Sequence, residues 1–225
     1  ELNLALLTVE EGGVLNGNRN RLEELYQRGV RLITLTWNYE NCIGSPNSAN
    51  RKVMRKGLKP FGIETVRRMN ELGMIVDVSH LSDGGFYDCV KYSEFPIVAS
   101  HSNARSLCLH PRNLTDEMLR LLGNKGGVAG VNFYSAFLRK EGRAEISDIV
   151  KHILYMIDKA GEDAVAAYLE HNGYVIRDRN WRKNRLELDI VATKDNGLII
   201  VEVKTRSNTE YIKPQDAVNW QKIRR

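Results

Sequence analysis

Short apolar runs rich in β-branched residues alternate with amphipathic stretches between Arg31 and Tyr134. The runs typical of buried strands are RLITLTW, MIVDVSH, PIVAS and GVAGVNFY, and helical periodicity marks GIETVRRMNELG and TDEMLRLLGNKGG. We expect the first helix to follow Pro60 and to end at Gly73, and the second to begin at Thr115, a helix-capping residue type. Near-continuous apolar strands separated by helices predict an α/β fold with a parallel sheet covered on both faces.

The pattern changes near Gly161. The stretch GEDAVAAYLEHNG predicts one amphipathic helix, and the runs YVIRDRNWR, LELDIVATKD and LIIVEVKTR predict three strands joined by short polar turns. A helix followed by a β-meander is an α+β pattern, which differs from the βα alternation before it. We therefore predict two domains, residues 1–160 and 161–225, although no Pro-, Gly- or Ser-rich linker separates them.

The composition is that of an ordinary globular protein and excludes a collagen-like, low-complexity or wholly disordered chain. Of the 225 residues, 42% are hydrophobic and 27% are charged. No apolar run reaches the roughly 18 residues of a membrane-spanning helix, and the first residues lack a signal-peptide pattern, so we expect a cytoplasmic protein without a membrane span. The net charge of +5 is mild and by itself weak evidence for nucleic-acid binding. Three widely spaced cysteines predict free thiols: Cys42, Cys89 and Cys108.

Two histidines, His80 and His101, each follow an apolar strand and a serine, about one βα unit apart. In a (β/α) barrel, chemistry takes place at the carboxyl ends of the strands. Imidazole nitrogens suit Zn²⁺, and a carboxylate such as that of Glu11 can bridge two ions, so these residues form a candidate binuclear metal site. The alternative is that each histidine is a hydrogen-bonded polar residue without a metal.

Residues from about 6 to 160 resemble the membrane (renal-type) dipeptidase family of zinc metallopeptidases. The segments that carry the resemblance are VEEGGVL, LYQRGVRLITLTWNYEN, GLKPFGIETVRRMNELGMIVDVSHLS, PIVASHSNARSLCLHPRNLTDEML and GGVAGVNFY. The resemblance implies a partial (β/α)₈ TIM-type barrel, a zinc cofactor and the hydrolysis of dipeptides by metal-activated water.

The same resemblance implies roles for individual residues. Glu11 matches the carboxylate that bridges the two metal ions, and His80 and His101 match ligands of the second ion. Arg112 matches the arginine that holds the substrate carboxylate, a role that suits the guanidinium fork; the alternative is a surface or helix-capping arginine. Tyr134 is expected to line the substrate pocket.

Three features of the family have no counterpart in this sequence. Trp37 stands where family members carry a histidine, and no histidine precedes His80 to form the family's His-x-Asp pair for the first metal ion. The late catalytic aspartate, in a GSDFDG-like segment, is also missing after Gly161. We therefore expect no useful dipeptide hydrolysis from this chain alone.

A second candidate site combines Asp189 with Glu202 and Lys204. In a strand, residues i and i+2 point to one side, so Glu202 and Lys204 are expected to face Asp189 on the neighbouring strand. Paired carboxylates of this kind can bind Mg²⁺ beside a phosphate, and the lysine can stabilise developing charge. The alternative is a solvated strand face of alternating charges.

Residues 161–225 resemble the YraN-like family of endonucleases, which has a restriction-endonuclease-like fold. The resemblance implies a partial α+β core, a possible Mg²⁺ cofactor, a nucleic-acid partner and catalytic positions at Glu162, Asp189, Glu202 and Lys204, with Glu187 assisting.

We interpret the whole chain as a chimeric or truncated zinc-dependent dipeptidase that carries a nuclease-like C-terminal segment. One alternative is a metal-dependent endonuclease-like or nucleic-acid-binding protein that acts through the C-terminal part. The other is a non-catalytic remnant. The remaining histidines, His110, His152 and His171, are predicted to lie on the surface or on a helix face.

Overall fold

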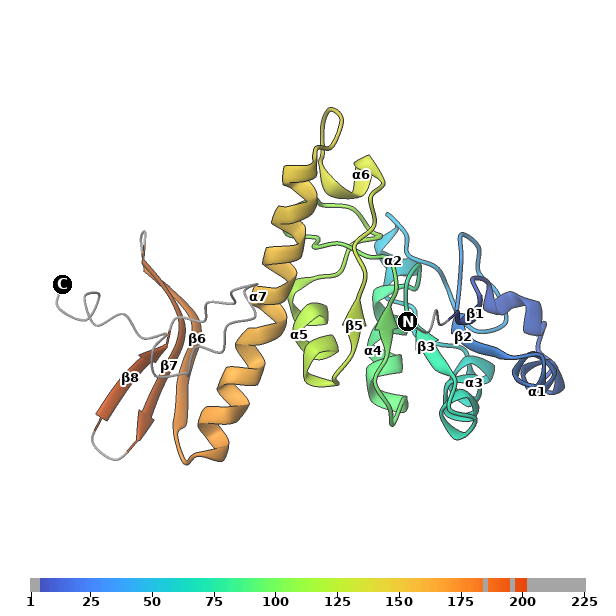
Figure 1. The fold of residues 1–225 in the computed structure, drawn as a ribbon, viewed down its shortest axis with the longest axis horizontal. Helices are drawn as coiled ribbons and strands as arrows, with labels where there is room; N and C mark the ends of the chain where they lie inside the picture. Colours follow the sequence, from blue (N-terminus) through green and yellow to red (C-terminus); the bar gives the residue numbers. More distant parts are fainter. Residues whose placement is uncertain (1–4, 184–185, 195–196, 202–225) are drawn as a thin grey trace. The chain divides into compact units, whose positions relative to one another are not determined.

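The computed structural model describes residues 5–183, 186–194 and 197–201 (Figure 1). It consists of two units, which divide between Met156 and Ile157 inside one long helix. Each unit is described by itself below.

The first unit is built on five parallel strands in the order β1-β2-β3-β4-β5. The strands are β1 (Leu7–Val9), β2 (Val30–Thr34), β3 (Ile75–Asp77), β4 (Val98–Ala99) and β5 (Val128–Ala129). The predicted α/β fold with a parallel sheet is therefore confirmed. The prediction also has helices covering both faces of the sheet. The edge strands are only partly covered, since Leu7 on β1 and Val128 on β5 are exposed.

Helices connect successive strands, as the sequence predicts. The connecting helices are η1 (Gly12–Leu15, a 3₁₀ turn), α1 (Asn20–Gln27), α2 (Arg51–Met54), α3 (Pro60–Glu71), α4 (Asp83–Tyr92) and α5 (Asp116–Asn124). Two more helices, α6 (Ser135–Leu138) and α7 (Ile146–His171), follow β5. Pro60 opens α3, and Gly73 adopts a φ of 69° just after it, a conformation that glycine tolerates best. The Thr115 hydroxyl accepts the Met118 N–H at 3.2 Å and caps α5, as expected.

The core of the first unit lies between the sheet and these helices, with α4 between α3 and α5 (Figure 1). Its fully buried side chains include Ile33, Leu35, Val66, Met69, Ile97 and Leu119. Burial of this apolar surface is the main favourable term in folding the unit. Cys42 is half-buried, while Cys89 and Cys108 are buried; all three are free thiols, as predicted.

The second unit contains the C-terminal part of α7 and a three-stranded antiparallel meander in the order β6-β7-β8. The strands are β6 (Val175–Lys183), β7 (Leu186–Lys194) and β8 (Gly197–Val201). A small cluster of Leu169, Ile190 and Ala192 joins the helix to the sheet. The helix and meander were expected, whereas the restriction-endonuclease-like core stays a prediction. Among the described residues, no helix is both long and apolar enough to cross a membrane.

Candidate metal centre

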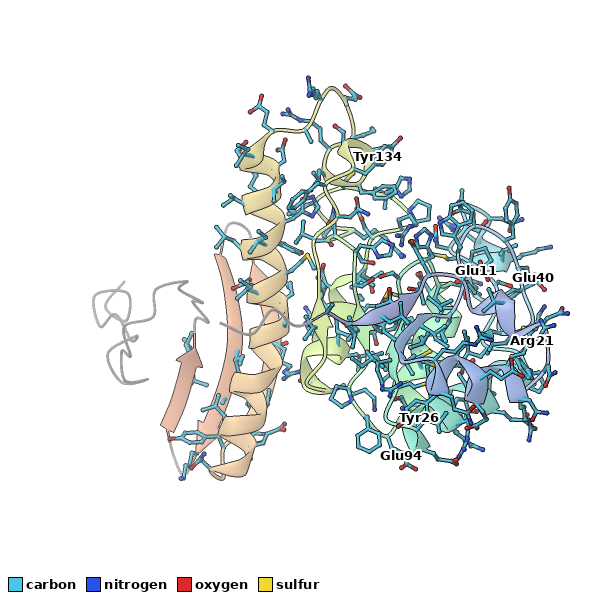
Figure 2. All side chains as sticks on the ribbon, turned by 45° about the vertical axis from the view of Figure 1, so that its right-hand side comes forward. Glu11, Arg21, Tyr26, Glu40, Glu94 and Tyr134 are labelled. Carbon is cyan, nitrogen blue, oxygen red and sulfur yellow. The ribbon has the colours of Figure 1, made fainter. Side chains whose placement is uncertain are left out.

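His80, His101 and Glu10 come together at the carboxyl ends of the parallel strands. Glu10 Oε1 lies 3.5 Å from His80 Nε2 and 3.3 Å from His101 Nε2, and the two imidazole rings are 5.0 Å apart. One ligand atom from each residue lies within 4.8 Å of the others. Figure 2 shows the neighbouring Glu11 at the same end of the sheet as Tyr134, and Glu94, which follows α4, at the opposite end.

The backbone fixes both histidines. His80 has a φ of 66°, a left-handed conformation that is uncommon for a residue with a side chain. Its carbonyl accepts hydrogen bonds from the Asn47 backbone N–H at 2.7 Å and from Asn47 Nδ2 at 2.9 Å. His101 follows β4, and its backbone N–H donates to Ser79 Oγ at 3.1 Å. The structure thus brings the two predicted histidines together at neighbouring strand ends.

Both imidazoles are held in the neutral form. Burial of the ring, the positive charge of Arg112 and the neighbouring His101 together lower the pKa of His80 to about 3. Burial also lowers the pKa of His101, again with Arg112 as the second cause. A neutral imidazole has one unprotonated nitrogen, which is the form that binds a metal ion.

The donor set fits a divalent cation. The Glu10 carboxylate can only accept hydrogen bonds, and it faces two neutral imidazoles that lie slightly beyond good hydrogen-bonding distance. In addition, His80 Nδ1 is buried without a hydrogen-bond partner among the described residues. Two imidazole nitrogens and one carboxylate oxygen are ligands that Zn²⁺ takes, and a cation between them would favour all three groups.

Glu11, the carboxylate expected to bridge two metal ions, makes other contacts. Its Oε1 accepts hydrogen bonds from the Gly13 N–H at 2.7 Å and from Asn41 Nδ2 at 2.6 Å, and its Oε2 accepts one from the Trp37 N–H at 2.9 Å. Glu10 is not among the residues predicted from the sequence. Consecutive residues of an extended chain point to opposite sides, so only one of the two glutamates can face the histidines directly. The ligand role of Glu11 stays a prediction.

Arg112 is a buried cation beside this cluster. It is 8% exposed, and its Nη2 donates to the His101 carbonyl at 3.4 Å. Its guanidinium lies 5.5 Å from the centre of the Phe137 ring. Burial lowers its pKa to about 10, so it stays charged at neutral pH, and it forms no ion pair within the described part of the chain. This burial excludes the alternative of a surface arginine.

Two exposed aromatic residues lie near Arg112 and His80: Tyr134, which contacts the ring beside Arg112, and Trp37. The Tyr134 ring lies 5.0 Å from that of Phe137, the ring that Arg112 also contacts. Trp37 is exposed, and its ring lies 6.5 Å from that of His80. An open hollow of about 270 Å³ is lined by Val9, Glu10, Glu11 and Trp37.

His152 was expected on a surface or helix face, but it is buried in α7 with 1% exposure. Its Nδ1 accepts the Ala104 N–H at 3.1 Å, and its Nε2 lies 3.1 Å from the Leu138 carbonyl. Because Nδ1 accepts, the proton is on Nε2 and donates to Leu138. Both ring nitrogens are therefore occupied, which makes His152 a structural residue.

The predicted nuclease residues are only partly within the described chain. Glu162 lies in α7 and Asp189 lies in β7, while Glu202 and Lys204 lie outside the described residues. Their assembly into a site stays a prediction.

Comparison with protein families gives two matches. The family described as "Membrane dipeptidase (Peptidase family M19)" matches residues 3–175. The family described as "Uncharacterised protein family UPF0102", which is the YraN family, matches residues 161–225. The two matches overlap over residues 161–175.

Two curated relatives are similar to this chain. An uncharacterized protein in the pqqA 5′ region of Klebsiella pneumoniae is 40% identical over 180 residues, 76% of this chain and 65% of that protein. An uncharacterized dipeptidase of Schizosaccharomyces pombe is 41% identical over 155 residues, 68% of this chain and 37% of that protein. The chain thus spans less than two thirds of the length of either relative.

Two solved structures resemble the fold. The metallopeptidase dipeptidase AC of family M19 is 28% identical with a TM-score of 0.64, covering 70% of this chain and 49% of that chain. A Rhodobacter sphaeroides metallopeptidase, liganded with a phosphinate mimic of the dipeptide L-Ala-D-Ala, is 25% identical with a TM-score of 0.64. That match covers 75% of this chain and 57% of the metallopeptidase.

Proposed function

This chain belongs to the membrane dipeptidase family, and we propose that its first unit carries a dipeptidase-type site that binds a zinc ion beside the carboxylate of a dipeptide. The observation that carries the proposal is the Glu10–His80–His101 cluster. Its three ligand atoms lie within 4.8 Å of one another, which places all three within reach of a single cation. A bound zinc ion would supply a water molecule of lowered pKa as the nucleophile for hydrolysis.

We propose Glu10 as the carboxylate ligand that the geometry favours, because its Oε1 already faces both Nε2 atoms. Glu11 instead holds the backbone N–H groups of Gly13 and Trp37, which shapes the loop above the site. The two adjacent glutamates can therefore be tested against each other.

Arg112 is proposed to bind the carboxylate of the dipeptide. A buried guanidinium without an ion pair in the described residues is strongly stabilised by an incoming anion, and its planar fork can donate two parallel hydrogen bonds. The predicted substrate contact from Tyr134 is supported by its position beside Phe137, the ring that Arg112 also contacts. The same charge disfavours protonation of His80 and His101, which favours the metal-binding form.

The sequential order of five parallel strands also supports the predicted TIM-type barrel, because neighbouring strands of such a barrel follow one another along the chain. The barrel itself is a proposal, as are zinc as the metal, dipeptides as the substrate and the cytoplasmic location. The predicted nuclease function of residues 161–225 rests on the family resemblance. No observation in the described residues favours it, so no second function is proposed.

Zinc binding to the 225-residue chain tests the proposal directly. Titration against a chromophoric chelator should show tight zinc binding that is lost in His80→Asn and His101→Asn. The matched control is His152→Gln, which removes a buried imidazole whose nitrogens are both already hydrogen-bonded. Glu10→Gln should weaken zinc binding more than Glu11→Gln. Circular dichroism verifies that each variant is folded.

Binding of L-Ala-D-Ala to the zinc-loaded chain tests the substrate half of the proposal by calorimetry, and release of free alanine reports hydrolysis. We expect binding, with little turnover from this chain alone. Zinc-dependent turnover that His101→Asn abolishes would support the proposed function and contradict the low activity predicted from the sequence. A folded chain that binds neither zinc nor the dipeptide would overturn the proposal.

A further inference from the structure

Asp77 is a fully buried carboxylate at the end of β3, and it forms no ion pair in the described part of the chain. It is satisfied by four hydrogen bonds. Its Oδ1 accepts the backbone N–H groups of Ser79 and Ser100, each at 3.0 Å. Its Oδ2 accepts the hydroxyl groups of Thr34 and Ser100, each at 2.6 Å. Four donors match the four lone-pair positions of an ionised carboxylate, so Asp77 has no place for a proton of its own.

The Ser100 hydroxyl links this carboxylate to a proposed metal ligand. Its Oγ lies 2.6 Å from Asp77 Oδ2 and 2.7 Å from His101 Nδ1. A hydroxyl group has one proton to donate, and an ionised carboxylate can only accept. The Ser100 proton therefore belongs to the bond with Asp77, and Ser100 Oγ must accept the other bond from His101 Nδ1–H.

The Ser79 hydroxyl agrees with this direction. It accepts the His101 backbone N–H at 3.1 Å and lies 3.3 Å from Ser100 Oγ, to which it can donate its own proton. Ser100 Oγ then donates once and accepts twice, which is its full capacity. The hydrogen-bond network thus leaves His101 a single neutral form, with the proton on Nδ1 and an unprotonated Nε2 facing Glu10 at 3.3 Å.

We propose that Asp77 and Ser100 are positioning residues that hold His101 as the Nδ1–H tautomer and so present its Nε2 lone pair to the metal ion. The inference rests on the proposed metal site for its purpose, but the tautomer itself is a property of the metal-free protein. Metal-binding histidines commonly donate the other ring N–H to a carboxylate or carbonyl, which fixes the ring and strengthens binding. Here the carboxylate acts through a serine. His80 lacks a serine or carboxylate partner of this kind, since its Nδ1 is buried without a hydrogen-bond partner in the part of the chain that the structure describes.

Asp77→Asn offers a sharp test because it reverses the direction of the chain of hydrogen bonds. The amide oxygen can still accept the two backbone N–H groups, while the amide NH₂ replaces the oxygen that faces Ser100. The Ser100 hydroxyl then accepts from the amide and donates to His101 Nδ1. We therefore expect His101 to change to the Nε2–H tautomer.

Thr34→Val is the matched control. Thr34 is buried like Asp77, and its hydroxyl donates to the same Asp77 oxygen as Ser100 does. The substitution removes that hydrogen bond but leaves Ser100 and His101 in place. A merely structural role for Asp77 predicts that both variants behave alike. Ser100→Ala is a second variant, which removes the acceptor of the His101 Nδ1–H directly.

Long-range ¹H–¹⁵N NMR spectra of the metal-free protein identify which ring nitrogen of His101 carries the proton. We expect Nδ1–H in the wild type and in Thr34→Val, Nε2–H in Asp77→Asn, and a reduced share of Nδ1–H in Ser100→Ala. Zinc affinity should fall by about 10- to 100-fold in Asp77→Asn and change little in Thr34→Val.

An Nε2–H wild-type tautomer, or Nδ1–H that persists in Asp77→Asn, would overturn the inference. If Asp77→Asn does not fold, unchanged Nδ1–H in Ser100→Ala would overturn it equally. A wild-type protein with the Nδ1–H tautomer that fails to bind zinc would overturn the proposed function and leave the tautomer assignment standing.

Discussion

Gly130 follows β5 where the chain passes against the end of β4, and replacing it with alanine should disturb the metal centre from a distance. A Cβ atom at this position would lie 2.0 Å from the Ser100 carbonyl oxygen and 3.0 Å from its carbonyl carbon. Carbon–oxygen contacts are normally about 3.3 Å or longer, so the two backbones must separate by about 1 Å. The Gly130 N–H bond to the Ala99 carbonyl, now 2.8 Å, lies directly beside this contact.

The expected cost follows from this clash. Overpacking by one methyl group typically destabilises a protein by about 1–3 kcal/mol. Alanine also restricts the unfolded chain, which stabilises the folded state by about 0.4–1 kcal/mol where the backbone angles suit alanine. This gain applies here because φ of Gly130 is not positive. The net loss is about 1–2 kcal/mol, which lowers the unfolding temperature by about 2–8 °C in a chain of this size.

Zinc binding should suffer as well, because Ser100 holds both Asp77 and the His101 ring. We expect Gly130→Ala to weaken zinc binding about tenfold, within the range known for changes behind a metal ligand. The control is Gly44→Ala, whose Cβ would meet its nearest neighbour, Leu58 Cδ2, at an ordinary 3.4 Å. Thermal unfolding and zinc titration of both variants measure the two effects. Wild-type behaviour of Gly130→Ala in both assays would refute the reasoning.

Three further predictions concern single side chains. Arg112→Met should raise the Kd of L-Ala-D-Ala by about 10- to 100-fold in calorimetry, since charged hydrogen bonds contribute about 1.5–3 kcal/mol, and an unchanged Kd would exclude Arg112 as the carboxylate ligand. Burial raises the pKa of the Cys89 thiol, so at pH 8 a thiol reagent followed by mass spectrometry should label the half-buried Cys42 first; equal labelling of the folded protein would contradict this. Burial lowers the pKa of His152 from 6.5, so the unfolded state binds its proton more readily and stability should be lost as the pH falls below 6.5. Urea unfolding should show that His152→Gln loses less stability than the wild type as the pH falls. An identical pH dependence of stability in the wild type and the variant would contradict this role of His152.

The hydrophobic pattern alone determined much of the fold. Alternation of β-branched runs with amphipathic stretches is enough to predict a parallel α/β sheet, because the strands at the centre of such a sheet are buried on both faces and each helix needs one apolar face. The start of α3 at Pro60, its end near Gly73 and the cap of α5 at Thr115 follow from local backbone chemistry. The sequence also predicts that His80 and His101 lie close together, because neighbouring parallel strands bring their carboxyl ends to one edge of the sheet.

Tertiary packing decided what the sequence left open. Which of two adjacent glutamates faces the histidines depends on how the turn after β1 is held by Asn41 and Trp37, both distant in sequence from Glu10. The burial of His152 depends on how α7 packs against the loop at Ala104, and no local pattern encodes that contact. These features rest on hydrogen bonds between segments far apart in the chain, whereas strand and helix patterns record only whether a position is buried.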